Sequence, residues 1–188
     1  AYGSTLWPIT FGGGASYSDG DAGDGGGIIS IFANSVTIDG DIYVDGENGY
    51  VASGHSGGAG GSLLIDTNII SISGKLSASG FPSDVKGAGG RIAVYYNSGS
   101  ISDSVFDTWT AFGSSNSLNS HGTIIAVDKT NKNILMSDFQ FQNSTGKAND
   151  TISTFFYNPE DSNKWENVSS LKIIGANSVR FDKNYFVN

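Results

Sequence analysis

The chain of 188 residues lacks cysteine, has only three prolines and is poor in basic residues. Without cysteine it forms no disulfide and no thiolate metal site, and its redox compartment stays open. Ten lysines and arginines against eighteen acidic residues give a net charge of −8, which argues against nucleic acid as a partner. Since it holds no apolar run of about 18 residues, the sequence predicts no membrane span.

Glycine, by contrast, is abundant, and part of it recurs in a fixed pattern. Gly27, Gly61 and Gly90 each precede an apolar, β-branched run, at spacings of 34 and 29 residues. An asparagine follows each of them after seven residues. Such self-similarity predicts a stacked repeat architecture. The asparagines fit a ladder at the turn corners, because asparagine tolerates left-handed backbone and can bond neighbouring backbone groups; they are Asn34, Asn68 and Asn97.

Apolar and polar residues alternate within each unit, as in SVTIDGDIYVDG, which predicts short strands with one buried face. The glycine clusters between them indicate sharp bends or close backbone approach, and a flexible linker is the alternative. We therefore expect an all-β fold, a right-handed parallel β-helix (a solenoid) of about five to six rungs, irregular in its C-terminal half. Alignment of the first two units pairs Ile29 with Leu63, Ile31 with Ile65, Val36 with Ile70, Ile38 with Ile72 and Ile42 with Leu76.

Residues 1–188 are predicted to form a single domain. Residues 1–24 form a cap or an arm that docks on a neighbouring subunit, 25–128 the regular rungs, and 129–188 less regular ones. Val187 falls in phase with Val44, so the sequence stops in mid-rung, and we expect another rung or subunit to stack there. The expected assembly contacts are Trp7, Phe11, Tyr185 and Val187.

Ligand chemistry is sparse in this sequence. Asp19, Asp21 and Asp24 lie on a glycine-rich loop and could converge on Ca²⁺, which takes oxygen ligands, although their spacing misses the EF-hand pattern. A solvated acidic loop is the alternative, and no other cofactor is expected. Three sequons permit N-glycans in a secreted eukaryotic protein, at Asn143, Asn149 and Asn167.

Catalytic patterns are absent from the sequence. The two histidines, His55 and His121, have no serine or carboxylate at the spacing of a known triad motif. No catalytic residue is therefore assigned, and we do not expect an enzyme.

The runs GGSLLI, ISGKLSASG and GAGGRIAVYY, together with HGTII at His121, resemble the glycine-rich rungs of pectin-lyase-like β-helix proteins. The resemblance covers residues 25–128 well and the rest loosely. It implies the fold and a secreted or cell-surface location. Members of the family with lyase or hydrolase activity carry clustered Asp, Arg or Lys on one outer face, and this sequence shows no such repeated cluster.

These observations favour an extracellular structural or adhesive module, a segment of a fibre or filament that self-associates head to tail, with surface glycans as further partners. The alternative is a carbohydrate-binding or polysaccharide-processing domain with an acidic groove around residues 19–47. Ice binding would need ladders of Thr-x-Thr, and only Thr108 and Thr110 form that triplet.

Overall fold

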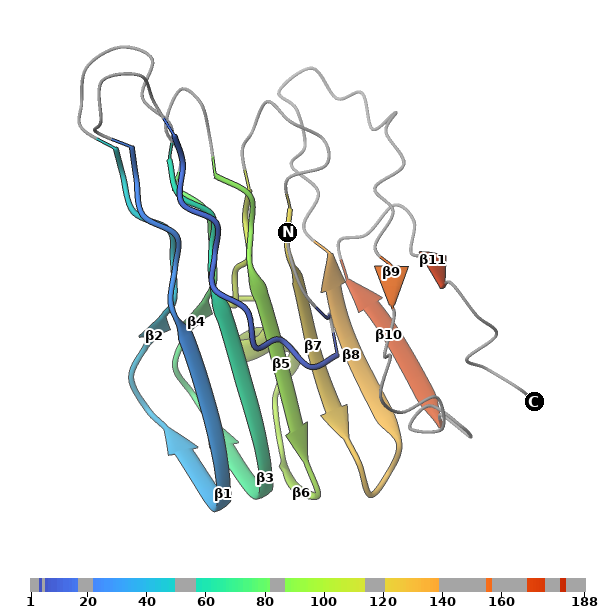
Figure 1. Cartoon of the computed structure of the whole chain (residues 1–188). Coiled ribbons are helices and arrows are strands. Elements are labelled where there is room, and N and C mark those ends of the chain that lie inside the picture. Colours follow the sequence, from blue (N-terminus) through green and yellow to red (C-terminus); the bar gives the residue numbers. More distant parts are fainter. Residues whose placement is uncertain are drawn as a thin grey trace.

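The computed structural model of the chain describes Ser4 and residues 6–16, 22–49, 57–81, 87–113, 121–138, 155–156, 169–174 and 180–181. The described residues are mostly strands, arranged in mixed, open sheets with very little helix (Figure 1). None of their helices is long and apolar enough to cross a membrane. In chain order the elements are β1 (Ile28–Ile38), β2 (Ile42–Tyr43), β3 (Ser62–Ile72), β4 (Leu76–Ser77), β5 (Arg91–Tyr96), β6 (Ser98–Ser100), α1 (Asp103–Phe106), β7 (Thr123–Asp128), β8 (Asn133–Asp138), β9 (Phe155–Phe156), β10 (Ser170–Ile174) and β11 (Arg180–Phe181).

The repeat units stack on one another through their strands. We number them unit one (22–49), unit two (57–81), unit three (87–113) and unit four (121–128). The strands β1, β3, β5 and β7 pair in parallel in that order, and β6 continues the third unit beside β3. All five apolar pairings that the alignment of units one and two predicts are confirmed by the strand register. The repeat spacing in the sequence is therefore the number of residues from one stacked unit to the next.

A second strand layer closes the core from behind. There β2 pairs in parallel with β4, and Ser77 of β4 bridges in parallel to Thr110 of unit three. Inward side chains of both layers stack in columns, and burying each large aliphatic contributes roughly 1.5–3 kcal/mol. In unit three, α1 lies along the chain between β6 and Thr110. Ser102 caps this helix, and its Oγ accepts a hydrogen bond from Val105 N–H. Fully buried core residues include Leu63, Ile65, Leu76, Ile92, Val94, Phe106, Trp109 and Ala111.

Glycine-rich segments extend both layers beyond the strands. They are not strands themselves, yet backbone hydrogen bonds join them from unit to unit, for example Gly26 N–H to Ala59 and Gly60 N–H to Ala88, both at 2.8 Å. A Cβ added to Gly58 would lie less than 3.0 Å from the backbone of Asp24. Glycine recurs here because only a backbone without a side chain can pack so closely.

The N-terminal segment lies across the outer face of the main sheet (Figure 1). Leu6 is buried there with Leu64, Ala93 and Ile125, and its carbonyl accepts a hydrogen bond from the Tyr95 hydroxyl. Farther along, the segment joins the glycine layers. Within the described part of the chain, it therefore covers a face of the sheet, and it leaves the edge of β1 without a partner strand.

The parallel stacking stops at β7. Residues 129–132 form a tight turn, and β8 returns antiparallel to β7. The Asp128 carboxylate fixes this turn by accepting from the N–H groups of Thr130 at 3.0 Å and Asn131 at 2.8 Å, and Lys132 adopts a φ of 57°. Beyond the turn, β10 pairs in parallel with β8, and β11 with β9. The chain thus contains two stacks of opposite strand direction. The sequence predicted parallel rungs that become less regular from residue 129, and it did not predict this reversal.

Candidate functional site

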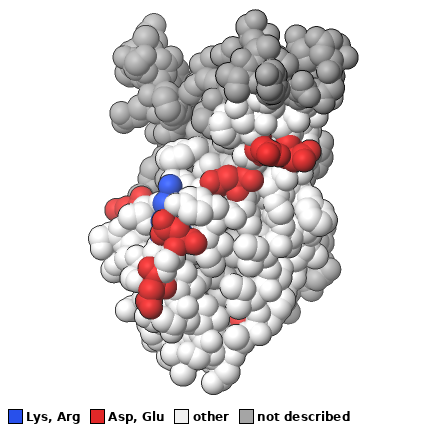
Figure 2. Space-filling model, turned by 90° about the vertical axis from the view of Figure 1, so that its left-hand side faces the viewer, with Lys and Arg blue, Asp and Glu red and all other residues white. Residues whose placement is uncertain are grey.

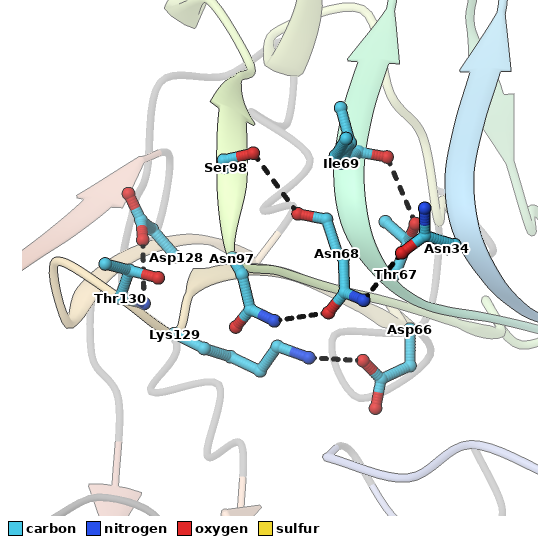
Figure 3. A network of polar contacts seen from close by, with 10 residues as sticks. All are labelled: Asn34, Asp66, Thr67, Asn68, Ile69, Asn97, Ser98, Asp128, Lys129 and Thr130. Carbon is cyan, nitrogen blue, oxygen red and sulfur yellow. Dashed lines mark hydrogen bonds and ion pairs between the residues drawn. The ribbon is translucent and has the colours of Figure 1, made fainter.

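The recurrent asparagines form a ladder on the surface of the main sheet (Figure 3). The side-chain amide of Asn68 donates to Asn34 Oδ1 at 2.9 Å, and that of Asn97 donates to Asn68 Oδ1 at 2.7 Å. Each asparagine stands where its strand bends, since the register passes from Ala33 to Ser35 without pairing Asn34. The ladder therefore runs in one direction, with each unit donating to the unit before it.

An ion pair flanks the ladder (Figure 3). Lys129 Nζ lies 2.5 Å from Asp66 Oδ1, so unit two is joined to the turn after β7. Both side chains are about one-third exposed. At such exposure a pair of this kind contributes at most about 1 kcal/mol. The sequence did not predict this pair, because its partners are 63 positions apart and share no local signal.

A row of carboxylates crosses the end of the molecule formed by β1 and β2 (Figure 2). Asp41 accepts from Lys75 N–H at 2.8 Å, and Asp45 accepts from Ser79 N–H at 2.6 Å. The hydrogen bond from the Lys75 backbone, and then that from the Tyr43 hydroxyl, lower the pKa of Asp41. Because Asp41 and Asp45 of unit one accept hydrogen bonds from unit two, they hold these two units together through their side chains. We name Asp39, Asp41, Asp45 and Glu47 the acidic row.

The predicted calcium ligands are only partly described. Asp19 and Asp21 lie outside the described residues. Asp24 is exposed, and its backbone carbonyl accepts from Glu47 N–H at 2.8 Å. In the part of the chain that the structure describes, no three carboxylate or imidazole groups gather in a way that could hold a metal ion. The calcium site stays a prediction.

Two of the four predicted assembly residues are described. The Trp7 ring lies 5.9 Å from Phe32 and 6.1 Å from Tyr95, on the outer face of the main sheet, and Phe11 is 72% exposed. The two others, Tyr185 and Val187, lie outside the described residues, as do the sequons at Asn143, Asn149 and Asn167. Trp7 therefore lies on the outer face of the main sheet, and an assembly contact by any of the four residues stays a prediction.

His121 begins the fourth unit, and His55 lies outside the described residues. The Nδ1 of His121 accepts from Gly113 N–H at 3.2 Å. Burial lowers the pKa of His121, and a neutral ring is also what the accepting Nδ1 requires. This geometry gives His121 a role in joining unit three to unit four.

Comparison with known proteins gives no match: no family model, no curated protein and no solved structure is similar to this chain. What the site can do must therefore come from its geometry. Among the described residues, that geometry consists of hydrogen bonds and ion pairs between stacked units, and of an unpaired edge at β1.

Proposed function

We propose that the protein is an extracellular structural or adhesive module, a segment of a fibre or filament built by end-to-end stacking of units. In this proposal residues 25–128 form a right-handed parallel β-helix, in line with the right-handed connections usual between parallel strands. The observation that carries the proposal is the contrast between β1 and the strands inside the stack. The strands β3, β5, β7 and β8 are each bonded on both sides, whereas β1, 11 residues long, has one edge that pairs with no described strand.

The chemistry of that edge supports a joining role. An exposed, long and apolar strand edge attracts other strands, and proteins normally cover or charge it. Here Ile29 and Ile31 are only half-buried, although their partners in β3 are completely buried. The acidic row lies beside β2, so its negative charge belongs to the layer that β2 and β4 form. The edge of β1 carries no acidic residue. A joining surface accounts for this arrangement.

The remaining parts of the proposal concern the surroundings of the module. Composition poor in lysine and glutamate, and rich in Gly, Ser, Thr and Asn, suits a secreted or cell-surface protein. In that setting the three sequons would carry glycans, Asp19, Asp21 and Asp24 would bind Ca²⁺, and the activity would be mechanical instead of enzymatic.

Electron microscopy of the material purified from its natural source tests this proposal. Negatively stained filaments or fibres that contain this chain, with an axial repeat near the length of one module, are the expected result. Dispersed monomers that sediment as a single species of about the chain mass would contradict it. Treatment with a chelator and with a glycosidase before imaging then shows whether Ca²⁺ or glycans hold the assembly together.

A carbohydrate-binding function is the second candidate, favoured by one feature of the outer face. Phe32 is 61% exposed and pairs in register with Asp66, next to the asparagine ladder. An exposed aromatic ring beside carboxylate and amide groups suits a sugar. The small pocket between Thr10, Phe11 and Gly60 holds about 60 Å³, far below the size of an enclosed ligand site. Retardation on polysaccharide gels that Phe32→Ala abolishes would support this alternative.

A further inference from the structure

Every boundary between units uses the same backbone contacts. The glycine that leads a unit donates its N–H to a carbonyl on the returning segment of the unit before. The residue after it donates its N–H to the carbonyl of the preceding leading glycine. The first set is Gly61 to Val44 at 2.7 Å, Gly90 to Ala78 at 2.6 Å and Gly122 to Ala111 at 2.8 Å; the second is Ser62 to Gly27 at 3.0 Å, Arg91 to Gly61 at 2.9 Å and Thr123 to Gly90 at 3.1 Å.

Close packing explains why the leading residue is glycine. A Cβ on Gly61, Gly90 or Gly122 would come within 3.0 Å of the carbonyl oxygen of the leading glycine one unit earlier. Real Cβ atoms do not approach backbone oxygen so closely, so a side chain there would push the units apart. Glycine at this position therefore indicates that a preceding unit packs against it.

At the β1 edge the same groups are free. Gly27 is exposed, a Cβ on it would meet nothing within 4 Å, and no described residue accepts a hydrogen bond from its N–H. Ile28 takes the place of Ser62, so its N–H points to the free edge. The φ of Gly27 is not left-handed, so the backbone does not require glycine either. Gly40 repeats the case: it has open space, while its counterpart Gly74 packs on the Gly40 carbonyl.

Several side chains along the same edge also have fewer contacts than their counterparts in unit two. Ile29, Ile31 and Ile42 are half-buried, while their counterparts Leu63, Ile65 and Leu76 are fully buried. Asn34 accepts from Asn68 but donates its amide to no described residue. Each of these groups would be satisfied by one more unit placed before unit one.

We propose that the β1 edge binds a glycine-led unit of the same repeat type that runs parallel to β1 and lies outside residues 1–188. This rests on the proposed function, which also treats this end as a joining surface. The occupant follows from continuity with the interface between units: it offers a leading-glycine carbonyl to Ile28, a returning-segment carbonyl to Gly27 and an asparagine to Asn34.

Strand direction excludes β10 of a second copy as that unit. Since β8 is antiparallel to β7 and β10 is parallel to β8, β10 runs opposite to β1. A second copy stacked head to tail in the same orientation would offer β10 in the wrong direction.

The partner also lacks carboxylates facing the acidic row, because like charges about 4.8 Å apart repel. Serine and lysine, which unit two has at Ser73, Lys75 and Ser79, fit there.

A synthetic peptide of residues 57–80 is the probe, because it has all these features. We expect it to bind the full 188-residue chain and to slow hydrogen exchange at the amides of Gly27 and Ile28. Gly27→Ala should weaken binding at least tenfold and leave the thermal midpoint of the chain unchanged. Gly14→Ala is the matched control, since its Cβ would meet only ordinary contacts at 3.8 and 3.9 Å. A peptide of the same composition in scrambled order should not bind.

The inference would be overturned if the peptide did not bind, if the Gly27→Ala chain bound it equally well, or if the amides protected by the peptide lay away from β1. Self-association of the pure chain that Gly27→Ala abolishes would also overturn it, by assigning the edge to a second copy. The outcome is separate from that of the proposed function. Fibres in the native material without a Gly27-dependent peptide complex would contradict only this inference. A Gly27-dependent peptide complex without fibres would contradict only the proposed function.

Discussion

Single residues in this protein act mainly at the boundaries between units. The asparagine ladder has one amide in each of units one to three, and the carboxylates of Asp41 and Asp45 accept from backbone N–H groups of the next unit. All of these hydrogen bonds lie at exposed positions, where water competes for the same groups. Their value lies in repetition, because each fixes the register of one layer on the next.

One of these residues makes stability depend on pH. Burial lowers the pKa of His121 in the folded chain below its unfolded value of 6.5. The unfolded chain therefore binds a proton more readily, and the free energy of unfolding should fall as the pH drops from 6.5 toward the folded pKa. Urea unfolding at pH 7.5 and pH 5.0 measures this loss, above the range where aspartates titrate.

His121→Asn is the matched variant, because its Oδ1 can still accept from Gly113 N–H and it does not titrate. The variant should lose less stability than the wild-type chain between the two pH values. Equal losses in both proteins would show that His121 does not cause the pH dependence.

At the scale of elements, equivalent strands differ in how completely they are covered. Ile65 of β3 is fully buried between β1 and β5, whereas Ile31, its register partner in β1, is half-buried. Ile65→Ala should therefore lower the free energy of unfolding by about 3 kcal/mol and Ile31→Ala by about 1 kcal/mol. Chemical denaturation of the two variants gives the comparison, and equal losses would mean that the β1 edge is already covered in solution.

The N-terminal segment is the second element that the stack alone does not explain. It packs on the outer face through Leu6 and bonds to Tyr95, which lies 89 residues away. Burial raises the pKa of Tyr95 well above its usual value of 10.0, as expected for a hydroxyl enclosed under this segment. The outer face of β5 and β7 is thus a second core, covered by a segment and not by a strand layer.

In the described part of the chain, the main sheet is a short stack whose end strands are β1 and β10, and β1 is the free end of the repeat units. In such a stack each layer contacts only its neighbours, so stability should decrease toward the free end. Native-state hydrogen exchange is expected to show the slowest amides in β3 and β5, with those at the outer edge of β1 faster by orders of magnitude. Equal protection across β1, β3 and β5 would contradict this gradient and would indicate a partner on β1.

The sequence by itself determined the unit spacing, the strand faces and the register. These features could be predicted because they repeat along the chain: once Gly27 aligns with Gly61, the pairing of Ile29 with Leu63 follows, and alternation decides which side chains point inward. The asparagine positions came from the same alignment. Nothing beyond the linear pattern was needed, since stacking converts a repeat in sequence into a repeat in space.

The tertiary structure alone decided where the stack stops and what covers it. The reversal of strand direction at β8 depends on the turn that Asp128 stabilises, and the repeat pattern does not predict this reversal. The course of the N-terminal segment and the pairing of Asp66 with Lys129 rest on contacts between residues distant in sequence. The special position of Gly27 also depends on the tertiary structure. The sequence shows a glycine at the start of every unit, but only the packing shows that no described residue lies against Gly27.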